Sequence, residues 1–341
     1  MDLDTLHKGR QTIVFDRHPV ILAHSAIAGK KESVGPLAGF FDHTETDTRF
    51  GQKTWEKAET RLQELALDTA RSKAQLQYSD LDVLFAGDLL NQCISSAFAI
   101  RDTRIPFLGL YGACSTMAES LTLAAAAVNA GYAARAAALT SSHFATAERQ
   151  YRFPLGYGGQ RTPTAQWTVT GSGCCIVASN GRGPYLNCAT IGRIEDYGIK
   201  DANNMGAAMA PAAYSTLRAH FADTGLRPQD YDLIVTGDLG TLGSTIVTDL
   251  FQRDGVEFGA NYRDCGVLIY DLKRQDVHAG GSGCGCGASV LCGYLLRQLR
   301  EKKINSLLFC ATGALMSPVS TWQGESIPAI CHAISISNER R

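Results

Sequence analysis

Cys114 is the residue of this chain best suited to covalent chemistry. It lies in the segment YGACSTM, residues 111–117, and an Ala-rich run follows it. We expect it to open a helix. Unpaired N–H groups and the positive end of the dipole at a helix start lower the pKa of a thiol and favour a bound anion. Spacing alone also allows Cys114 to be a small buried hydrophobe, as free cysteines often are.

Two carboxylates end two similar segments. Residues 80–89 read DLDVLFAGDL, and residues 230–239, 150 positions later, read DYDLIVTGDL. Each is a short apolar run that ends in Gly-Asp, which is typical of a buried strand of a parallel sheet leading into a loop. Because both loops are expected at the carboxyl ends of their strands, we expect Asp88 and Asp238 to face each other across one pocket.

A second correspondence, at an offset of 170 residues, places Cys114 on Cys284. Cys114 precedes an expected helix and a strand at residues 136–140, and Cys284 precedes an expected helix at 288–302 and a strand at 306–310. Two matches in the same order predict an internal duplication. The expected division is an N-terminal half, residues 1–185, and a C-terminal half, residues 186–341, with loops from both converging on one pocket.

Composition excludes several classes of function. The 341 residues are 45% apolar and carry a formal net charge of −1, so nothing favours a counterion-driven grip on nucleic acid or on an anionic membrane surface. The 11 cysteines lack the spacing of a disulfide framework, which indicates a reducing compartment. The first ten residues do not resemble a secretory signal. The longest apolar stretch, residues 121–138, is short and interrupted by polar residues, which disfavours a membrane span.

Five segments carry motifs that resemble those of thiolases and ketoacyl synthases. They are residues 109–121 (GLYGACSTMAESL, the nucleophile motif), 87–89 (a Gly-Asn turn), 171–178 (GSGCCIVA, a Gly-rich strand), 284–289 (CGCGAS, a Gly-His or Gly-Asn motif) and 308–313 (LFCATG, a final strand). The resemblance covers nearly the whole chain. It implies an α/β, thiolase-like five-layered α/β/α/β/α fold made from two duplicated halves, and relatives of this fold are usually homodimers.

The sequence departs from that superfamily at positions whose side chains are required for catalysis. Condensation or decarboxylation requires two polar groups from the second half, normally two histidines or a histidine and an asparagine, to stabilise an oxyanion and move protons. Asp238 and Cys284 stand in their place, and a carboxylate beside a developing oxyanion raises the barrier. His278, six residues before Cys284, is expected to be a loop or surface histidine. We therefore expect a binding pocket and no enzyme; the alternative is a cysteine-dependent ketoacyl synthase or acyltransferase acting on coenzyme A or carrier-protein thioesters.

Four further segments are more specific. They are residues 9–20 (GRQTIVFDRHPV), 34–39 (VGPLAG), 50–58 (FGQKTWEKA) and 141–155 (SSHFATAERQYRFPL). They resemble the stage V sporulation AD family of endospore-forming bacteria. The resemblance implies a protein that binds dipicolinic acid, pyridine-2,6-dicarboxylate, and assists its uptake into the forespore and its release on germination. It also implies membrane subunits of the stage V sporulation A system as partners, at the cytoplasmic side of the forespore or spore inner membrane.

Such a planar dianion needs N–H donors, cations and an apolar slot. We expect the helix start at Cys114 to supply donors. Arg149, Arg152 or Arg161 is expected to supply a cation from a long loop that begins at Arg149. His143, three residues past its expected strand end, is expected at the pocket edge.

The role of the two carboxylates stays open at this point. Asp88 and Asp238 suit a protonated pyridine nitrogen, an anchor to backbone, or a calcium ion carried with the ligand. The expected ligand-binding set is Asp88, Cys114, His143, Arg149, Arg152, Asp238 and Cys284. No catalytic residue, resident metal or cofactor is expected, and no nucleic acid partner.

Overall fold

The computed structural model describes residues 6–151 and 160–340. The main strands of the first half are β3 (Val20–Ala28), β5 (Val83–Gly87), β6 (Phe107–Gly109), β7 (Arg135–Ser142) and β9 (Gly171–Ala178). Those of the second half are β10 (Tyr185–Thr190), β11 (Leu233–Thr236), β12 (Tyr262–Asp264), β14 (Ser306–Ala314) and β15 (Ala329–Ser337). Short strands are β1 (His7–Lys8), β2 (Thr12–Val14), β4 (His43–Thr44), β8 (Trp167–Thr168) and β13 (Gly281–Ser282).

The two halves have the same strand order. The strands lie side by side as β12-β11-β14-β15-β10-β3-β9-β7-β5-β6, and β10 meets β3 at one antiparallel pair, Tyr185 with Val20. Outward from that junction, each half runs through its first, fifth, fourth, second and third strand. The structure thereby confirms the duplication that the two sequence offsets predict. The division at residues 185 and 186 stays a prediction.

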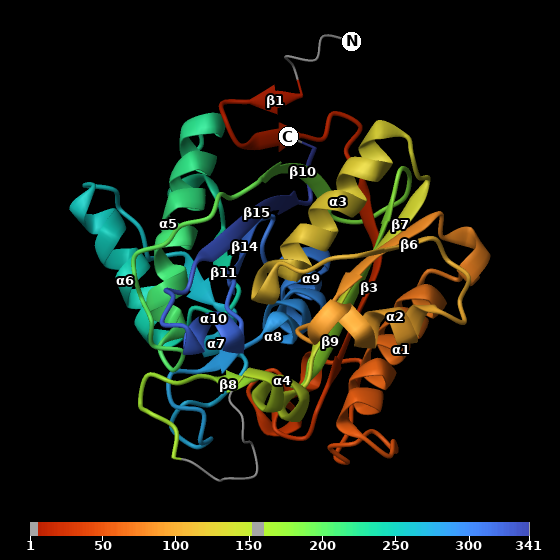
Figure 1. Cartoon of the computed structure of the whole chain (residues 1–341). Coiled ribbons are helices and arrows are strands. Elements are labelled where there is room, and N and C mark those ends of the chain that lie inside the picture. Colours follow the sequence, from red (N-terminus) through yellow and green to blue (C-terminus); the bar gives the residue numbers. More distant parts are fainter. Residues whose placement is uncertain (1–5, 152–159, 341) are drawn as a thin grey trace.

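The helices are α1 (Trp55–Lys73), α2 (Ile94–Ile100), α3 (Thr116–Ala130), α4 (Phe144–Tyr151), α5 (Met205–Thr224), α6 (Gly240–Arg253), α7 (Cys265–Leu268), α8 (Cys284–Ser289), α9 (Leu296–Arg300) and α10 (Pro318–Trp322). A π-helical turn, Val290–Leu295, joins α8 to α9. In Figure 1, α1 and α2 cover one outer side, α5 and α6 cover the other, and α3, α8 and α9 lie in the middle.

The central helices make the core continuous between the halves. Helix α3 contacts β5 and β7 of its own half and β14 and β15 of the other. Its Ala-rich sequence lets strands approach closely from both sides, and Met117, Leu121 and Val128 are buried in the main hydrophobic cluster. Sheets covered on both faces carry near-continuous apolar strands, and every residue of β9 and β14 is buried accordingly.

The repeated unit positions the two expected cysteines as the sequence predicts. Strand β5 runs parallel to β7, and β11 runs parallel to β14. Cys114 lies just before α3, and Cys284 is the first residue of α8. Both cysteines therefore lie at helix starts on the inner side of the molecule.

The long loop expected from Arg149 begins later than predicted, because α4 continues to Tyr151. The reason is local: FATAERQY contains good helix formers and neither Gly nor Pro. Four residues of α4 are buried, from Ala145 to Glu148, so the helix is also held by packing.

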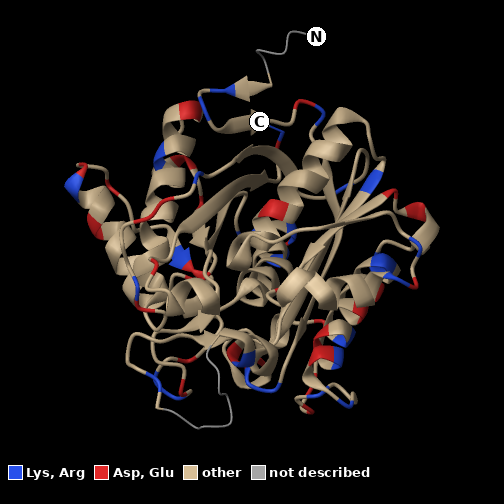
Figure 2. Cartoon of the chain, viewed as in Figure 1, with Lys and Arg blue, Asp and Glu red and all other residues tan. Residues whose placement is uncertain are grey.

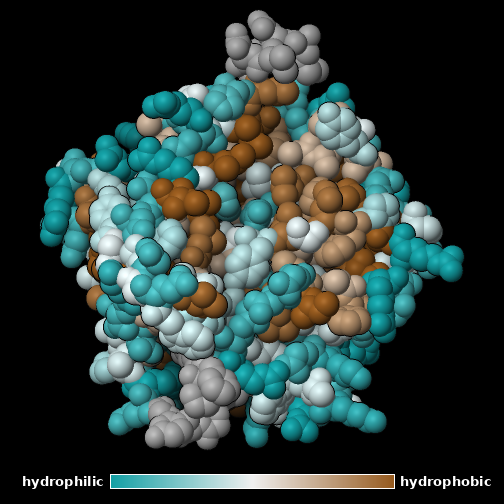
Figure 3. All heavy atoms as spheres, in the orientation of Figure 1, coloured by the Kyte–Doolittle hydropathy of each residue, from teal (hydrophilic) through white to brown (hydrophobic). Residues whose placement is uncertain are grey.

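Charged side chains are spread around the surface, whereas a group of exposed hydrophobic side chains lies in one region. Figure 2 shows Lys, Arg, Asp and Glu interspersed around the periphery, and Figure 3 shows hydrophobic side chains over the region of α2 and β6. Within the described ranges, no helix combines the length and the apolar character that crossing a bilayer requires.

Candidate functional site

Loops from both halves meet at a small, partly open cavity that reaches Cys114, and we call it the Cys114 pocket. Its wall is largely apolar with a few polar groups: Leu89, Tyr111, Ala113, Cys114, Ala147, Glu148, Tyr151, Thr168, Met205, Ser282, Ala314 and Met316. Leu89 follows β5 of the first half, whereas Ala314 ends β14 of the second. The pocket therefore depends on the duplication for its construction.

Close backbone packing holds the turn that carries Cys114. The turn is a short 3₁₀ segment, Ala113–Ser115, leading directly into α3. Ala113 has a φ of 50°, a left-handed conformation that costs roughly 1–2 kcal/mol in a non-glycine residue. On β14, a Cβ added to Gly313 would lie 2.2 Å from the carbonyl oxygen of Gly112. Because any larger residue at position 313 would clash with this carbonyl oxygen, a glycine is required there for β14 to pack against the turn.

The expectation that the helix start lowers the thiol pKa of Cys114 is wrong. Burial raises this pKa well above its usual value, and the hydrogen-bonded carboxylate of Asp238 raises it further. The side chain is only 7% exposed, so loss of water and a neighbouring negative charge outweigh the helix start. Cys114 is held as a neutral thiol, which is a poor nucleophile.

Asp238 is anchored directly behind Cys114. Its Oδ1 accepts a hydrogen bond from Thr312 Oγ1 at 2.9 Å, and its Oδ2 accepts one from the Gly283 N–H at 3.0 Å. Burial raises the pKa of Asp238 to about 6, although the hydrogen bonds that it accepts from Cys114 and Thr312 lower it. An ionised carboxylate here has no proton to donate to an oxyanion formed at the thiol.

Cys284 fills space beside Cys114. The two cysteines pack in one apolar cluster with Ala147, and the Cys284 thiol donates to the Ser141 carbonyl oxygen at 2.9 Å. Burial raises the pKa of Cys284 well above its usual value. A histidine or asparagine at this position would present a polar group to a substrate, whereas this thiol is turned to the backbone.

Asp88 does not face Asp238, and this expectation is wrong as well. Its Oδ1 accepts from the Leu90 N–H at 2.9 Å, and its Oδ2 accepts from the N–H and Oγ of Ser96 at 2.8 and 2.7 Å. These bonds tie the end of β5 to α2, and the acidic neighbour of Asp88 is Glu59. Asp88 and Asp238 both accept hydrogen bonds from backbone N–H groups. Of the three roles considered for them, a pyridine partner, a calcium ligand or an anchor to backbone, these contacts support the anchor.

His143 and Arg149 lie outside the wall of the Cys114 pocket. His143 Nε2 is 2.8 Å from the Thr48 carbonyl oxygen, and its Nδ1 accepts from the Ala145 N–H at 3.1 Å. Burial lowers the pKa of His143, which favours a neutral ring. Arg149 is paired with Glu56 on α1. The structure thus brings Cys114, Asp238 and Cys284 together, and separates these two residues from them.

Arg161 and His278 also lie outside the wall of the Cys114 pocket, and both pair with Asp276. Arg152 lies outside the described residues. Arg161 Nη2 donates to the carbonyl oxygen and the Oδ1 of Asp276 at 3.0 and 3.1 Å, and its guanidinium lies over the Trp167 ring. His278 pairs with Asp276 at 3.0 Å, in keeping with a loop histidine.

The sequence reasoning missed the polar rim of the pocket. The hydroxyls of Tyr111 and Tyr151 are hydrogen-bonded to each other, and Tyr151 also donates to the Leu89 carbonyl oxygen at 2.7 Å. Glu148 Oε1 accepts from Thr168 Oγ1 at 3.0 Å. Helical spacing could have indicated part of this rim, because residues 148 and 151 are three apart and therefore lie on the same face of a helix.

The Cys114 pocket is therefore an apolar slot with hydroxyl donors and acidic neighbours. Its described wall includes Glu148 and contains neither Lys nor Arg. In residues 6–151 and 160–340, no three or more His, Cys, Asp or Glu side chains cluster in a way that could hold a metal ion. The arrangement can bind a flat, partly apolar ligand, but it provides no ionised nucleophile for acyl transfer.

Comparison with known sequences yields one family. A family model described as stage V sporulation protein AD matches residues 9–337. The stage V sporulation protein AD of Bacillus subtilis (strain 168) is 47% identical over 327 residues, which cover 96% of each chain.

Comparison with solved structures yields the thiolase-like condensing enzymes. The 3-oxoacyl-[acyl-carrier-protein] synthase III of Aquifex aeolicus VF5 aligns with a TM-score of 0.58 at 12% identity, over 94% of this chain and 99% of that one. Cerulenin-bound OleA of Xanthomonas campestris aligns with a TM-score of 0.60 at 14% identity, over 95% and 97%. At such low identity these neighbours show the fold alone, and the thiolase-like fold predicted from the motifs is confirmed.

Proposed function

The chain belongs to the stage V sporulation protein AD family, and we propose that it is a sporulation protein that binds dipicolinic acid without catalysing a reaction. In this proposal it assists uptake of the ligand into the forespore and release on germination. Membrane subunits of the stage V sporulation A system are its partners at the cytoplasmic side of the inner membrane, and it acts as a homodimer.

The contact between Asp238 and Cys114 is the observation that supports a non-catalytic role most directly. Acyl transfer requires a thiolate and donors for the oxyanion that forms beside it. Here a buried carboxylate accepts a hydrogen bond from the thiol, which stays protonated, and its negative charge raises the thiol pKa. Asp238 therefore disfavours attack by Cys114 on an acyl group, while the cavity in front of the thiol can still hold a ligand that does not react.

The polar groups of the Cys114 pocket suit one carboxyl end of a planar ligand. Tyr111 can turn its hydroxyl from Tyr151 toward a ligand carboxylate. Tyr151, Thr168 and Ser282 add hydroxyl oxygens to the wall, but each already donates its hydrogen within the protein. The apolar wall, including Met205 and Met316, suits the ring.

The acyltransferase alternative keeps one structural argument. The fold is that of the condensing enzymes, and Cys114 keeps the position of the helix-start nucleophile. A coenzyme A or carrier-protein thioester would have to lower the thiol pKa on binding for this alternative to work.

Calorimetric titration with dipicolinate, with and without calcium, separates these functions when mass spectrometry tests for acyl transfer from acetyl- and malonyl-coenzyme A in parallel. We expect saturable dipicolinate binding and no mass increase. Cys114→Ala should weaken binding by less than about tenfold, or ~1.4 kcal/mol, because a thiol that is bonded to Asp238 contributes little to the ligand. Cys188→Ala, on β10, is the matched control.

Absence of dipicolinate binding together with an acyl group on Cys114 would overturn the proposal and restore the enzyme. An acyl adduct that is lost in Cys114→Ala and kept in Cys188→Ala would locate the chemistry at this thiol.

A further inference from the structure

A second and larger cavity lies on the other side of β8 from Cys114. It has a volume of about 630 Å³ and is lined by Trp55 and Trp167, so we call it the tryptophan pocket. Successive residues of a strand point to opposite faces, and Trp167 lines this cavity whereas Thr168 lines the Cys114 pocket. Helix α4 divides in the same way, since Phe144 lines the tryptophan pocket and Glu148 lines the Cys114 pocket.

Cations cover both tryptophan rings. Lys31 Nζ lies 3.5 Å from the centroid of the Trp167 ring, and the Arg161 guanidinium carbon lies 4.7 Å from it. Phe144 stacks on Trp167 with centroids 3.9 Å apart and planes 12° from parallel. Aromatic and cationic groups thus form one wall, a combination that attracts flat anions through ring contact and charge.

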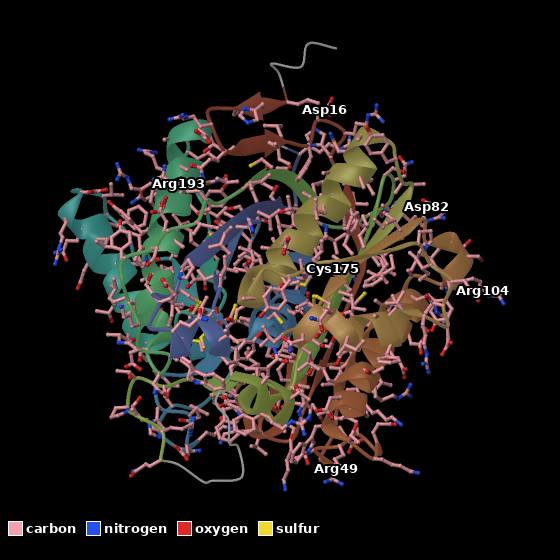
Figure 4. The ribbon with its side chains drawn as sticks, viewed as in Figure 1. Asp16, Arg49, Asp82, Arg104, Cys175 and Arg193 are labelled. Carbon is pink, nitrogen blue, oxygen red and sulfur yellow. The ribbon has the colours of Figure 1, made fainter. Side chains whose placement is uncertain are left out.

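The second indole is surrounded in a similar way. Guanidinium carbons lie 5.6 Å from the Trp55 ring centroid for Arg49 and 6.0 Å for Arg149. Arg49 is labelled in Figure 4 at the end of the molecule where α1 begins. Arg149 is held by Glu56, and Arg49 has the carboxylate of Asp47 nearby.

The two lysines of the tryptophan pocket form no side-chain ion pair in the described part of the chain, although Asp276 and Glu32 lie near Lys31. Lys30 is exposed and makes no side-chain ion pair there, and Lys31 Nζ donates to a backbone oxygen, that of Asp276, at 3.0 Å. Arg161 forms an ion pair with the same residue, Asp276. Its Nη1 is buried and makes no hydrogen bond to a described residue. Burial and the neighbouring Arg161 lower the pKa of Lys31. These like charges repel each other, and a bound anion would relieve the repulsion.

The floor of the cavity adds a neutralisable acid and a hydroxyl. Glu32 is buried and accepts from the Tyr270 hydroxyl and, at 3.2 Å, from the Thr170 N–H. Burial raises the pKa of Glu32 to about 6, so this carboxyl takes up a proton more readily than a solvated one when an anion binds beside it. Thr170 Oγ1 accepts from the Phe144 N–H at 3.1 Å, which leaves its own hydrogen free to donate to a ligand.

We propose that the tryptophan pocket is a second binding site, selective for planar aromatic carboxylates, in which Lys30 and Lys31 bind the carboxylates and the indoles contact the ring. The inference rests on the proposed function and deepens it, because dipicolinate is then the ligand of this pocket too. The lysines supply the positive charge that the described wall of the Cys114 pocket lacks. A flat ring and two carboxylates match the wall, whereas a flexible aliphatic dicarboxylate matches only its charge.

Intrinsic fluorescence can report this pocket alone. The chain has three tryptophans, two of which line the pocket, so Trp322→Phe leaves only the indoles of interest. We expect dipicolinate to change this emission saturably, with free tryptophan as the control for light absorption by the ligand. Glutarate, whose two carboxylates are also separated by three atoms, should have no effect at the same concentration.

Removing the positive charges of Lys30 and Lys31 tests whether the lysines bind the carboxylates. In the Trp322→Phe background, replacing both Lys30 and Lys31 by Ala should weaken the fluorescence titration tenfold or more and reduce its dependence on salt, because two charge-assisted contacts are lost. Lys200→Ala, an exposed lysine of the other half, should leave it unchanged. The unfolding midpoint of each variant shows that the protein is still folded.

The outcomes distinguish this inference from the proposed function. If calorimetry shows dipicolinate binding whose affinity and stoichiometry survive the double lysine substitution, and the fluorescence does not respond, the tryptophan pocket is not a site and the proposed function stands. If folded protein gives neither heat nor a fluorescence change with dipicolinate, the proposed function fails and the inference fails with it.

Discussion

Buried acids without basic partners dominate the chemistry of single residues in this protein. Asp238 is held at Cys114, and Glu59, a buried residue of α1, lies close to Asp88. Glu59 accepts hydrogen bonds from Ser141 Oγ at 3.1 Å and from Thr146 Oγ1 at 2.6 Å. Burial raises the pKa of Glu59 well above its usual value, and the charge of Asp88 raises it further. The pair therefore keeps a proton to higher pH than two solvated carboxyls do.

We expect Glu59→Gln to gain stability relative to the unchanged protein as pH rises from 5 to 8. The raised pKa of Glu59 means that the folded state binds a proton that the unfolded state releases above about pH 4.5. Stability is therefore lost as pH rises through this range. Glutamine removes that loss and can still bond Thr146, so the difference in unfolding free energy should grow by about 1.4 kcal/mol or more.

Denaturant unfolding at several pH values measures this difference. Glu64→Gln, at a partly exposed position of the same helix, is the control and should show a nearly constant difference. A pH-independent difference for Glu59→Gln would show that Glu59 ionises in the folded protein as it does in water.

At the scale of elements, glycines set how closely the two halves approach. A Cβ on Gly173 of β9 would lie 2.4 Å from the Ala288 carbonyl oxygen of α8, and one on Gly285 would lie 2.5 Å from the Gly171 carbonyl oxygen. The helix that begins at Cys284 thus rests directly on the strand of the other half. This contact positions Cys284 beside Cys114, so a packing change here also alters the pocket.

Gly173→Ala should lower the free energy of unfolding by about 1–3 kcal/mol, because backbone atoms must shift to admit the methyl group. Gly39→Ala is the matched control, since a Cβ at Gly39 meets no atom within 4 Å, and it should change stability by less than ~0.5 kcal/mol. Chemical denaturation of both variants measures the effect. Equal stability of the two would mean that β9 and α8 can separate without loss.

The whole molecule presents one sheet edge with exposed apolar side chains. Strand β6 ends the strand order in the first half, and Leu108 on β6 is 55% exposed while Phe98 on the adjacent α2 is 48% exposed. Figure 3 shows hydrophobic side chains gathered over this region. An unpaired, apolar edge is a template for a second chain, and a self-complementary contact of this kind would give a two-fold dimer.

We therefore expect the protein to be a homodimer and Leu108→Lys to shift it to a monomer, because an edge lysine discourages strand pairing. Light scattering coupled to size-exclusion chromatography measures the mass, and the unfolding midpoint shows whether the fold survives. Val319→Lys, at a 59% exposed position of the other half, should leave the dimer intact. A dimer that persists in Leu108→Lys would locate the interface elsewhere.

The sequence by itself determined the architecture and the helix-start position of Cys114. The repeated DLDVLFAGDL and DYDLIVTGDL segments became β5 and β11 in equivalent places of the two halves. Periodicity and turn residues act over a few neighbours, so strands, helix starts and their duplication can be read locally. The thiolase-like fold followed from the same local motifs.

Only the tertiary structure decided what the site residues contact and which of them are charged. Asp88 and Asp238 end similar strands, yet one is turned to Ser96 and the other to Cys114 and Gly283. The direction of a loop side chain depends on partners far along the chain, and a pKa depends on how much water those partners exclude. That is why the thiol of Cys114, expected to be acidic at a helix start, is neutral in the folded protein.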